Sequence, residues 1–341
     1  MLQRTALRFR LANHVHGLPF DPPRWGEAPR LRAKDTMPQG RGTAVAVLDS
    51  GVSWHPWLEG SYGEPVPDDA VERWDLSGPA LPRHVGHGTF VAGVVLQYAP
   101  AATLIPRRVI DINGDADDWR LAAVINDLVD ADPDVVNLSL GPTPNDQQGE
   151  VDEGTRLTVD ALRRLQDTCG TVVVVAGGNT EEQFPSEHIA PDDELTVVVG
   201  ALDLSRQPAW FSNAQPVRIW APGVDVLSSF VHFEGPVSLN HPEEDDHRGR
   251  RHHGHAAEPG ERPVAPFTGW ARWNGTSFAA PAVAGAVAAE ISSLSGIEDR
   301  AERRRRALLR VLDMAEPFET GEVKGKALAA SPVALQGPPR S

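Results

Sequence analysis

TAVAVLD (43–49) is a short, nearly continuous apolar run that ends in an acidic residue. A run of this length without polar alternation is typical of a strand that is covered on both faces, as in a parallel sheet. Four runs of the same kind follow along the chain: ATLIPRRVI (102–110), DVVNLSL (134–140), TVVVVAG (171–177) and LTVVVGA (195–201). We therefore predict a core of buried strands that begins near Thr43.

Stretches with helical spacing separate these runs. They are HGTFVAGVVLQ (87–97), DWRLAAVINDLVDA (118–131) and GTRLTVDALRRLQDT (154–168). Strands that alternate with helices form right-handed crossovers. The predicted fold class is therefore α/β: a doubly wound, mostly parallel sheet with helices on both faces, in a single domain. A helix of small residues is predicted at 278–294 and a second helix at 299–314, followed by a tail without clear structure.

Two segments lack the pattern of this core. Residues 1–40 are rich in Pro and Arg without a clear period, which indicates an extended N-terminal arm. Residues 232–266 hold six of the chain's twelve His, mixed with charged residues, Gly and Pro, and predict a flexible His-rich surface insertion. Metal binding by this tract stays an alternative, although the tract lacks the i, i+4 His pair on a helix that a defined site would show.

The charge balance limits the possible partners. The chain has 32 Lys and Arg against 47 Asp and Glu, and its net charge of −15 argues against a nucleic-acid partner. The run Arg303 to Arg306 is interpreted as the solvated face of a helix, with a binding patch as the alternative. No run approaches the roughly 18 apolar residues of a membrane span. Because no secretory signal is evident, we expect a cytoplasmic protein.

Cys169 is the only cysteine, so no intramolecular disulfide can form. This is compatible with a reducing cytosol but does not require one. Because Cys169 precedes an apolar strand, we interpret it as a buried structural thiol rather than as a nucleophile.

Polar residues stand where three of the predicted strands end. Asp49 ends the first strand, Asn137 to Gly141 end another, and Asn179 follows a third. Doubly wound sheets bind their ligands outside the carboxyl ends of the strands. The three strand ends therefore predict one shared site.

Ser277 and His87 are the candidates for nucleophilic chemistry. Ser277 lies in NGTSFAAP (274–281), at the start of the small-residue helix, where free N–H groups favour developing negative charge. His87 lies in GHGTFVAG (86–93), between two glycines that let the backbone approach closely. Taken alone, a Ser before a helix is usually an N-cap, and a lone His is usually structural. A serine nucleophile needs a base, a group that orients the base and donors for an oxyanion, and the chain offers a candidate for each.

The four polar residues lie in segments that resemble the signature motifs of the subtilisin-like serine protease (subtilase) family, in the family order. Asp49 lies in VLDSGV (47–52) and Asn179 in VVAGGN (174–179). Shorter matches are NLSLG (137–141), FP (184–185), WFSN (210–213) and APG (221–223). The resemblance implies that Asp49 orients His87, that His87 takes the proton of Ser277, and that Asn179 donates to the oxyanion. It implies a peptidase domain over residues 41–335 and a tail at 336–341.

The resemblance also implies a cleft for a peptide or protein substrate. Ser139 to Gly141 and a strand near Ile110 to Gly114 would pair with an extended substrate. The candidate substrate-binding residues are Ser139, Leu140, Gly141, Ala176, Gly177, Gly178, Gln183, Gly114 and Asp115. The acidic loop DINGDADD (111–118) beside the cleft is interpreted as a solvated turn. The alternative hypothesis is that it selects basic substrate residues on the non-prime side.

The predicted helix after His87 runs directly into the next strand, without the calcium-binding loop that interrupts this helix in many family members. We therefore expect no metal at that place and no cofactor. Phe90 and Phe278 stand where the family often has His and Met, and they are expected in the core. The leading prediction is a serine endopeptidase, selective and intracellular. The alternative is a latent or partner-activated regulatory module of the same fold.

Overall fold

The computed structural model describes residues 8–11, 23–63, 66, 70–72, 81–82, 84–111, 115–141, 153–179, 193–214, 216–234, 266–321 and 323–335. Some of the predicted features lie outside these residues: Gly114 and Gln183 of the substrate-binding set, the FP pair at 184–185 and most of the His-rich insertion. Their predicted roles stay predictions. At its start, the predicted insertion overlaps strand β11 (Val226–Phe233), and at its end it is followed directly by β12 (Phe267–Trp273). These two strands pair antiparallel, and β2 (Arg24–Trp25) pairs with β12.

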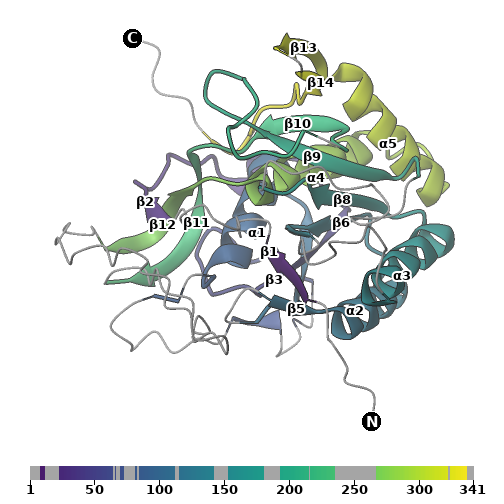
Figure 1. Cartoon of the computed structure of the whole chain (residues 1–341), viewed down its shortest axis with the longest axis horizontal. Coiled ribbons are helices and arrows are strands. Elements are labelled where there is room, and N and C mark those ends of the chain that lie inside the picture. Colours follow the sequence, from purple (N-terminus) through teal and green to yellow (C-terminus); the bar gives the residue numbers. More distant parts are fainter. Residues whose placement is uncertain are drawn as a thin grey trace, which may run out of the picture.

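An eight-stranded sheet forms the centre of the molecule (Figure 1). Its strand order is β13-β14-β10-β9-β8-β6-β3-β4, and every neighbouring pair from β14 to β4 is parallel. The bounds are β3 Ala44–Asp49, β4 Thr103–Arg108, β6 Val135–Leu138, β8 Val172–Ala176, β9 Thr196–Leu202, β10 Ile219–Pro222, β13 Glu316–Thr320 and β14 Val323–Ala327. The strands predicted from apolar runs are present, and the predicted α/β class is confirmed.

The tail after residue 314 was predicted to lack structure, and this is wrong. β13 and β14 form an antiparallel hairpin, and β14 joins the sheet where Ala327 pairs with Trp220 of β10. The Trp220 and Phe318 rings meet edge to face with centroids 5.8 Å apart. The hairpin therefore depends on a contact with a distant strand, which the mixed polar sequence of the tail does not reveal.

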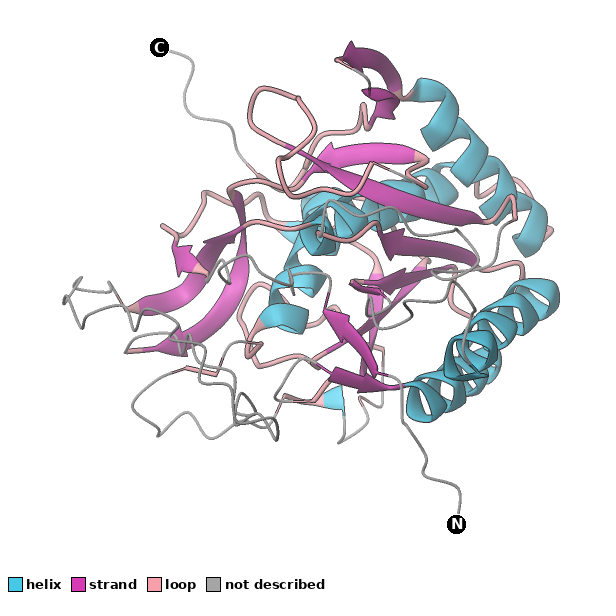
Figure 2. Cartoon of the chain, viewed as in Figure 1, coloured by secondary structure: helices cyan, strands magenta, loops and turns pink. Residues whose placement is uncertain are grey.

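Helices cover both faces of the sheet (Figure 2). One core cluster contains side chains of α1 (His87–Tyr98) and α4 (Thr276–Ser293), and the other contains those of α2 (Asp118–Ala131) and α3 (Glu153–Cys169). Alternate side chains of β3 enter different clusters: Val45 and Val47 belong to the first cluster, and Ala46 and Leu48 belong to the second. α5 (Arg300–Met314) packs against α4. Within the described part of the chain, no helix combines the length and apolar character of a membrane span.

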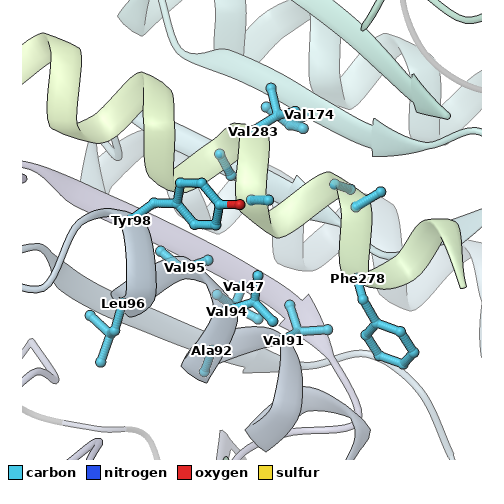
Figure 3. Close-up of a cluster of buried hydrophobic side chains, with 14 of the residues drawn as sticks. Val47, Val91, Ala92, Val94, Val95, Leu96, Tyr98, Val174, Phe278 and Val283 are labelled. Carbon is cyan, nitrogen blue, oxygen red and sulfur yellow. The ribbon is translucent and has the colours of Figure 1, made fainter. Parts of the chain in front are cut away.

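Close packing of α1 against α4 places the start of α4 at the carboxyl edge of the sheet. Figure 3 shows Val91 and Val95 of α1 gathered with Val47 of β3 and Val283 of α4. The helix backbones approach so closely that a Cβ added at Gly285 would stand 2.6 Å from the Val95 carbonyl oxygen. The small residues of α4 therefore let the helix lie buried between the sheet and its neighbours.

The prediction of a solvated face at Arg303 to Arg306 is wrong for Arg304. This side chain is fully buried, and its Nε donates to Asp134 Oδ1 at 2.8 Å while its Nη2 donates to the Asp132 carbonyl oxygen at 3.0 Å. Burial of the guanidinium is tolerated because acidic and carbonyl oxygens surround it. These partners lie about 170 residues earlier in the chain, so the charge pattern of the helix could not reveal them.

Cys169 is half-buried rather than buried. Its Sγ lies 3.6 Å from the Val129 carbonyl oxygen. Burial, followed by the charge of Asp132, raises the pKa of the thiol. Since the thiolate is the reactive form, a raised pKa fits a structural residue.

Buried His55 predicts a loss of stability in acid. Its Nε2 lies 2.8 Å from the Gly269 carbonyl oxygen and its Nδ1 accepts from the Trp57 N–H at 3.0 Å, so the two contacts suit a neutral ring protonated on Nε2. Burial lowers the pKa of His55 from 6.5 to about 4; the Gly269 contact opposes the shift, and His232 and Lys34 add to it. As the pH falls, the unfolded chain binds the proton first. The contribution of His55 to stability is therefore present above about pH 6.5 and declines toward about pH 4.

The measurement is the urea midpoint at several pH values. We expect the midpoint of the unsubstituted protein to fall between pH 6.5 and 4, and that of His55→Gln to fall less steeply. Equal slopes for the two proteins would contradict the prediction.

Candidate functional site

Asp49, the last residue of β3, and His87, the first residue of α1, meet at the carboxyl edge of the sheet. His87 Nδ1 lies 2.7 Å from Asp49 Oδ1, and both side chains are fully buried. Asp49 Oδ1 also accepts from the Ser50 N–H at 2.7 Å. A carboxylate that accepts from Nδ1–H leaves Nε2 as the acceptor nitrogen of the ring. His87 Nε2 makes no hydrogen bond to any described residue.

The glycines on either side of His87 bring it to Asp49. Gly86 precedes α1 with φ 81°, in the left-handed region that favours glycine. Gly88 lies so close to the loop after β3 that an added Cβ would stand 2.0 Å from the Gly51 carbonyl oxygen. The close backbone approach expected from the sequence is therefore present.

Ser277 lies in the first turn of α4, beside His87. The ring of its neighbour Phe278 has its centroid 5.2 Å from the centroid of the His87 ring. Ser277 Oγ donates to the Ser139 carbonyl oxygen at 3.2 Å, and Ser139 Oγ donates to the Ser277 carbonyl oxygen at 2.8 Å. The Ser277 hydroxyl is thus turned toward Ser139 rather than hydrogen-bonded to His87. In the absence of a substrate, the hydrogen bond between a catalytic nucleophile and its base is often long or poorly aligned.

Asn179, directly beyond β8, contacts the start of α4. Its Oδ1 accepts from the Thr276 N–H at 3.0 Å and from Thr276 Oγ1 at 2.9 Å. These bonds orient the amide, because they identify Oδ1 as the acceptor end and Nδ2 as the donor end. The structure therefore brings all four polar candidates, Asp49, His87, Asn179 and Ser277, to one edge of the sheet, as the strand ends predicted.

Glu72 also contributes to this site, although it was not predicted from the sequence. This carboxylate is buried; its Oε1 accepts from Ser50 Oγ at 3.0 Å and from the Gly86 N–H at 2.8 Å, and its Oε2 accepts from Ser53 Oγ at 2.9 Å. Ser50 follows Asp49 and Gly86 precedes His87, so Glu72 joins the two backbone segments that carry the pair. It lies outside every recognised motif, and no pattern in the sequence signals it.

Replacing Glu72 with alanine is expected to lower kcat about 10- to 100-fold with little change in KM, because the Asp49–His87 pair would lose its alignment. Glu72→Gln keeps acceptor capacity through its amide oxygen and is expected to lose less. Steady-state kinetics measure the effect, with Glu27→Ala, a change at an exposed carboxylate, as the matched control. A variant that loses stability but keeps the full kcat would show that Glu72 supports the fold alone.

The predicted substrate-binding residues are only partly brought together. Leu140 and Gly141 form β7 (Leu140–Gly141), and Asp115 begins β5 (Asp115–Asp117). Both strands pair antiparallel with β1 (Arg8–Leu11), which lies between them. Of the strand predicted near Ile110 to Gly114, the described residue Ile110 forms a single bridge to Ala116 of β5, and residues 112–114 lie outside the described residues.

Ala176, Gly177 and Gly178 lead from β8 to Asn179. Gly178 has φ 95°, and a Cβ there would stand 2.5 Å from Asn213 Nδ2. Asn213 Nδ2 donates to the Gly177 carbonyl oxygen at 2.9 Å. The turn that places Asn179 beyond the end of β8 therefore requires glycine at position 178. The role of Ala176, Gly177 and Gly178 in substrate binding stays a prediction.

The connection from α1 to β4 is short, as predicted: α1 ends at Tyr98 and β4 begins at Thr103. Phe90 and Phe278 are fully buried, with ring centroids 4.5 Å apart, which confirms their place in the core.

Across the residues described in the structure, no three His, Cys, Asp or Glu side chains group in a way that could hold a metal ion. The expected absence of calcium stays a prediction.

Known proteins resemble this chain in sequence and in fold. The model of the subtilase family matches residues 40–310. A thermostable alkaline protease of Halalkalibacterium halodurans is 30% identical over 205 residues, which are 56% of this chain and 50% of that protein. Subtilisin E of Bacillus subtilis is 28% identical over 284 residues, 78% of this chain and 59% of that protein.

A crystal structure of a cold-adapted subtilisin-like serine proteinase has a similar fold, with a TM-score of 0.59 at 20% identity. The match covers 94% of this chain and 99% of that one. The matched part of this chain spans about half the length of the alkaline protease of Halalkalibacterium halodurans, and about half that of a thermophilic serine proteinase of a Bacillus species that is also 30% identical.

Proposed function

Because the chain belongs to the subtilase family, we propose that it is a serine endopeptidase that hydrolyses peptide bonds through an acyl-enzyme. The observation that carries the proposal is the buried hydrogen bond of 2.7 Å between Asp49 Oδ1 and His87 Nδ1, beside Ser277 in the first turn of α4. This arrangement supplies a serine, a base with an acceptor nitrogen, and a carboxylate that orients the base.

In the proposed reaction, Ser277 Oγ attacks the carbonyl carbon of the scissile bond while His87 Nε2 takes the hydroxyl proton. Asp49 stabilises the imidazolium that forms. As the C–N bond breaks, His87 gives this proton to the leaving amine, and the acyl group stays on Oγ. Water then attacks the acyl carbon, Nε2 takes a proton from the water, and this proton returns to Oγ. The products are a carboxylic acid and an amine.

Two donors are suited to the oxyanion of the tetrahedral intermediate. One is Asn179 Nδ2, the donor end of an amide whose Oδ1 is held by Thr276. The other is the Ser277 N–H at the start of α4, where the helix dipole favours negative charge. Donors that are already oriented need no reorganisation during the reaction.

Replacing Asn179 with alanine is therefore expected to lower kcat about 10²–10³-fold, because one oxyanion donor is lost. KM should change little, since the interaction forms only in the transition state. The matched control is Asn126→Ala, which removes an amide on α2 that donates to Ala122. A kcat within threefold of the unsubstituted protein would exclude Asn179 as a donor.

The proposed function is tested by two measurements on the purified chain: hydrolysis of an unfolded protein, and covalent labelling by a fluorophosphonate probe. We expect products with new amino termini, and probe attached to Ser277 when labelled peptides are identified by mass spectrometry. Ser277→Ala should remove both signals. Labelling at another residue, or hydrolysis that survives Ser277→Ala, would overturn the assignment.

A latent form of the same enzyme is the second candidate, and one observation favours it. Ser277 and His87 have no exposed surface in this structure. A substrate can reach them only after the atoms that cover them have moved aside. In a latent enzyme, labelling of Ser277 would be slow in the isolated chain and faster once the cleft opens.

A further inference from the structure

Lysine is rare in this chain. Of its 32 Lys and Arg residues, only Lys34, Lys324 and Lys326 are lysines, and the others are arginines. The two side chains differ in their chemistry, because a guanidinium stays protonated in proteins whereas a lysine amine readily loses its proton when it is buried. A neutral amine is a nucleophile. The surroundings of each lysine therefore decide whether it can react with an electrophile.

Lys34 begins the short 3₁₀-helix η1 (Lys34–Thr36) and lies against the loop that follows β3. Its Nζ donates to Ser61 Oγ at 2.6 Å and to the Glu59 carbonyl oxygen at 3.5 Å, and it lies 4.6 Å from the centroid of the Trp57 ring. Lys34 is half-buried, while Ser61 and Trp57 are buried. The amine is therefore held between a hydroxyl, a carbonyl oxygen and an aromatic face.

These surroundings allow the amine to lose its proton. Among the described residues, no carboxylate forms an ion pair with Lys34, whereas Lys324 pairs with Glu319 at 2.9 Å. A hydroxyl can accept from an ammonium group and donate to a neutral amine, so Ser61 can stay the partner in both protonation states. Burial lowers the pKa of Lys34 from 10.5 to about 8, and the charge of Glu59 opposes this shift.

We infer that Lys34 is a modification site for activated acyl donors, the class of compounds that includes thioesters and acyl phosphates. In the reaction, the lone pair of the neutral Nζ attacks the acyl carbon, and a C–N bond forms. The bond from the acyl carbon to the thiolate or phosphate breaks, and the leaving group keeps its electron pair. The surplus proton of the nitrogen passes to solvent, and the product is a neutral amide.

Acylation of Lys34 would change the contacts of the loop after Asp49. An amide carries no positive charge, so the cation–π contact with Trp57 would be lost. The charge of Lys34 also contributes to the lowered pKa of His55, whose Nδ1 accepts from the Trp57 N–H at 3.0 Å. The modification would therefore act on the segment between Asp49 and Ser61, which connects this surface to the candidate site.

The first experiment measures the acetylation rate of each lysine in the purified chain near pH 7.5, with acetyl phosphate and a small acetyl thioester as the probes. Amines that remain free are converted with deuterated acetic anhydride after denaturation, so mass spectrometry gives the reacted fraction at each position. We expect Lys34 to react on the order of five- to tenfold faster than the other lysines, because far more of its amine is neutral at this pH. Selectivity with either probe supports the site, and the faster probe identifies the donor class.

Lys324 and Lys326 are matched controls in the same molecule. The Lys324 side chain is 73% exposed, and Lys326 Nζ donates to the Leu312 carbonyl oxygen at 3.2 Å. Unfolding in guanidinium chloride removes the surroundings of all three, so their rates should then agree within about twofold. Equal rates in the folded chain overturn the inference, and so does a selectivity for Lys34 that unfolding leaves unchanged.

The second experiment follows the same rates from about pH 6 to about pH 10. The neutral fraction of an amine stops rising above its pKa. We therefore expect the rate of Lys34 to level off above about pH 8, while the rate of Lys324 continues to increase. Parallel profiles of Lys34 and Lys324 over the whole range would contradict the inference.

Ser277→Ala distinguishes direct acylation from transfer through the proposed acyl-enzyme. This variant lacks the proposed nucleophile, so it should lose peptide hydrolysis while Lys34 keeps its acylation rate. Labelling of Lys34 that disappears in Ser277→Ala would come from an acyl-enzyme and would show that Lys34 is no site for free donors. A chain that cleaves peptides at Ser277 but acylates its three lysines equally refutes the modification site alone.

Discussion

Ser277→Ala is expected to lower kcat by about a million-fold, the loss that removal of the nucleophile causes in subtilisin. The nearby hydroxyl of Ser139 cannot replace the lost nucleophile. Ser139 Oγ donates to the Ser277 carbonyl oxygen at 2.8 Å and accepts from Asn137 Nδ2 at 2.9 Å, so it is held in a structural bond. The measurement is kcat for a fluorogenic peptide, with enzyme concentrations high enough to detect a residual rate.

The substitution should leave the fold intact. The described hydrogen bond of Ser277 Oγ goes to the Ser139 carbonyl oxygen at 3.2 Å, and a bond of this kind contributes about 0.5–1.5 kcal/mol. The unfolding midpoint should therefore stay within a few degrees of that of the unsubstituted protein, measured by circular dichroism. A variant that is folded and retains more than about a hundredth of the activity would show that another residue is the nucleophile.

The central strands could be predicted from the sequence because both of their faces are buried. β3 and β8 are apolar at nearly every position, and the two helical layers require this. β11 was not predicted, although it is largely buried. It carries Ser228 and Ser229, whose hydroxyls donate to the carbonyl oxygens of Phe90 and Thr89 in α1 at 2.7 and 2.9 Å. Polar residues satisfied by a distant helix do not follow an apolar pattern.

The residues of the candidate site also differ in whether a local pattern or a distant contact identifies them. Asp49 and His87 could be proposed because each stands in a recognisable local motif. Glu72 could not, since its role consists of three hydrogen bonds to residues 14 to 22 positions away. The place of β1 depends on pairing with strands more than 100 residues later, and its sequence has no period of its own. Local motifs therefore identified residues for the chemistry, while the supporting contacts required the fold.

Asp49→Ala is expected to lower kcat about 10⁴-fold, less than the loss of Ser277 because the nucleophile and the base remain. Asp49 Oδ1 accepts from His87 Nδ1 and from the Ser50 N–H, each at 2.7 Å. Alanine removes both bonds and the negative charge, so the ring loses its orientation and the imidazolium loses its counter-charge.

Asp49→Asn separates the contribution of the two hydrogen bonds from that of the negative charge, so it is the more informative variant. An amide oxygen in the place of Oδ1 can accept both of these bonds, while the charge is lost. We expect Asn to lose nearly as much kcat as Ala, because the protonated ring in the transition state needs a neighbouring anion in a buried site. Asp134→Asn, at a buried carboxylate outside the site, is the matched control and should change stability rather than kcat. If Asp49→Asn keeps kcat within tenfold of the unsubstituted protein, orientation rather than charge is the contribution of Asp49. If Asp49→Ala also keeps it, Asp49 is not part of the catalytic group.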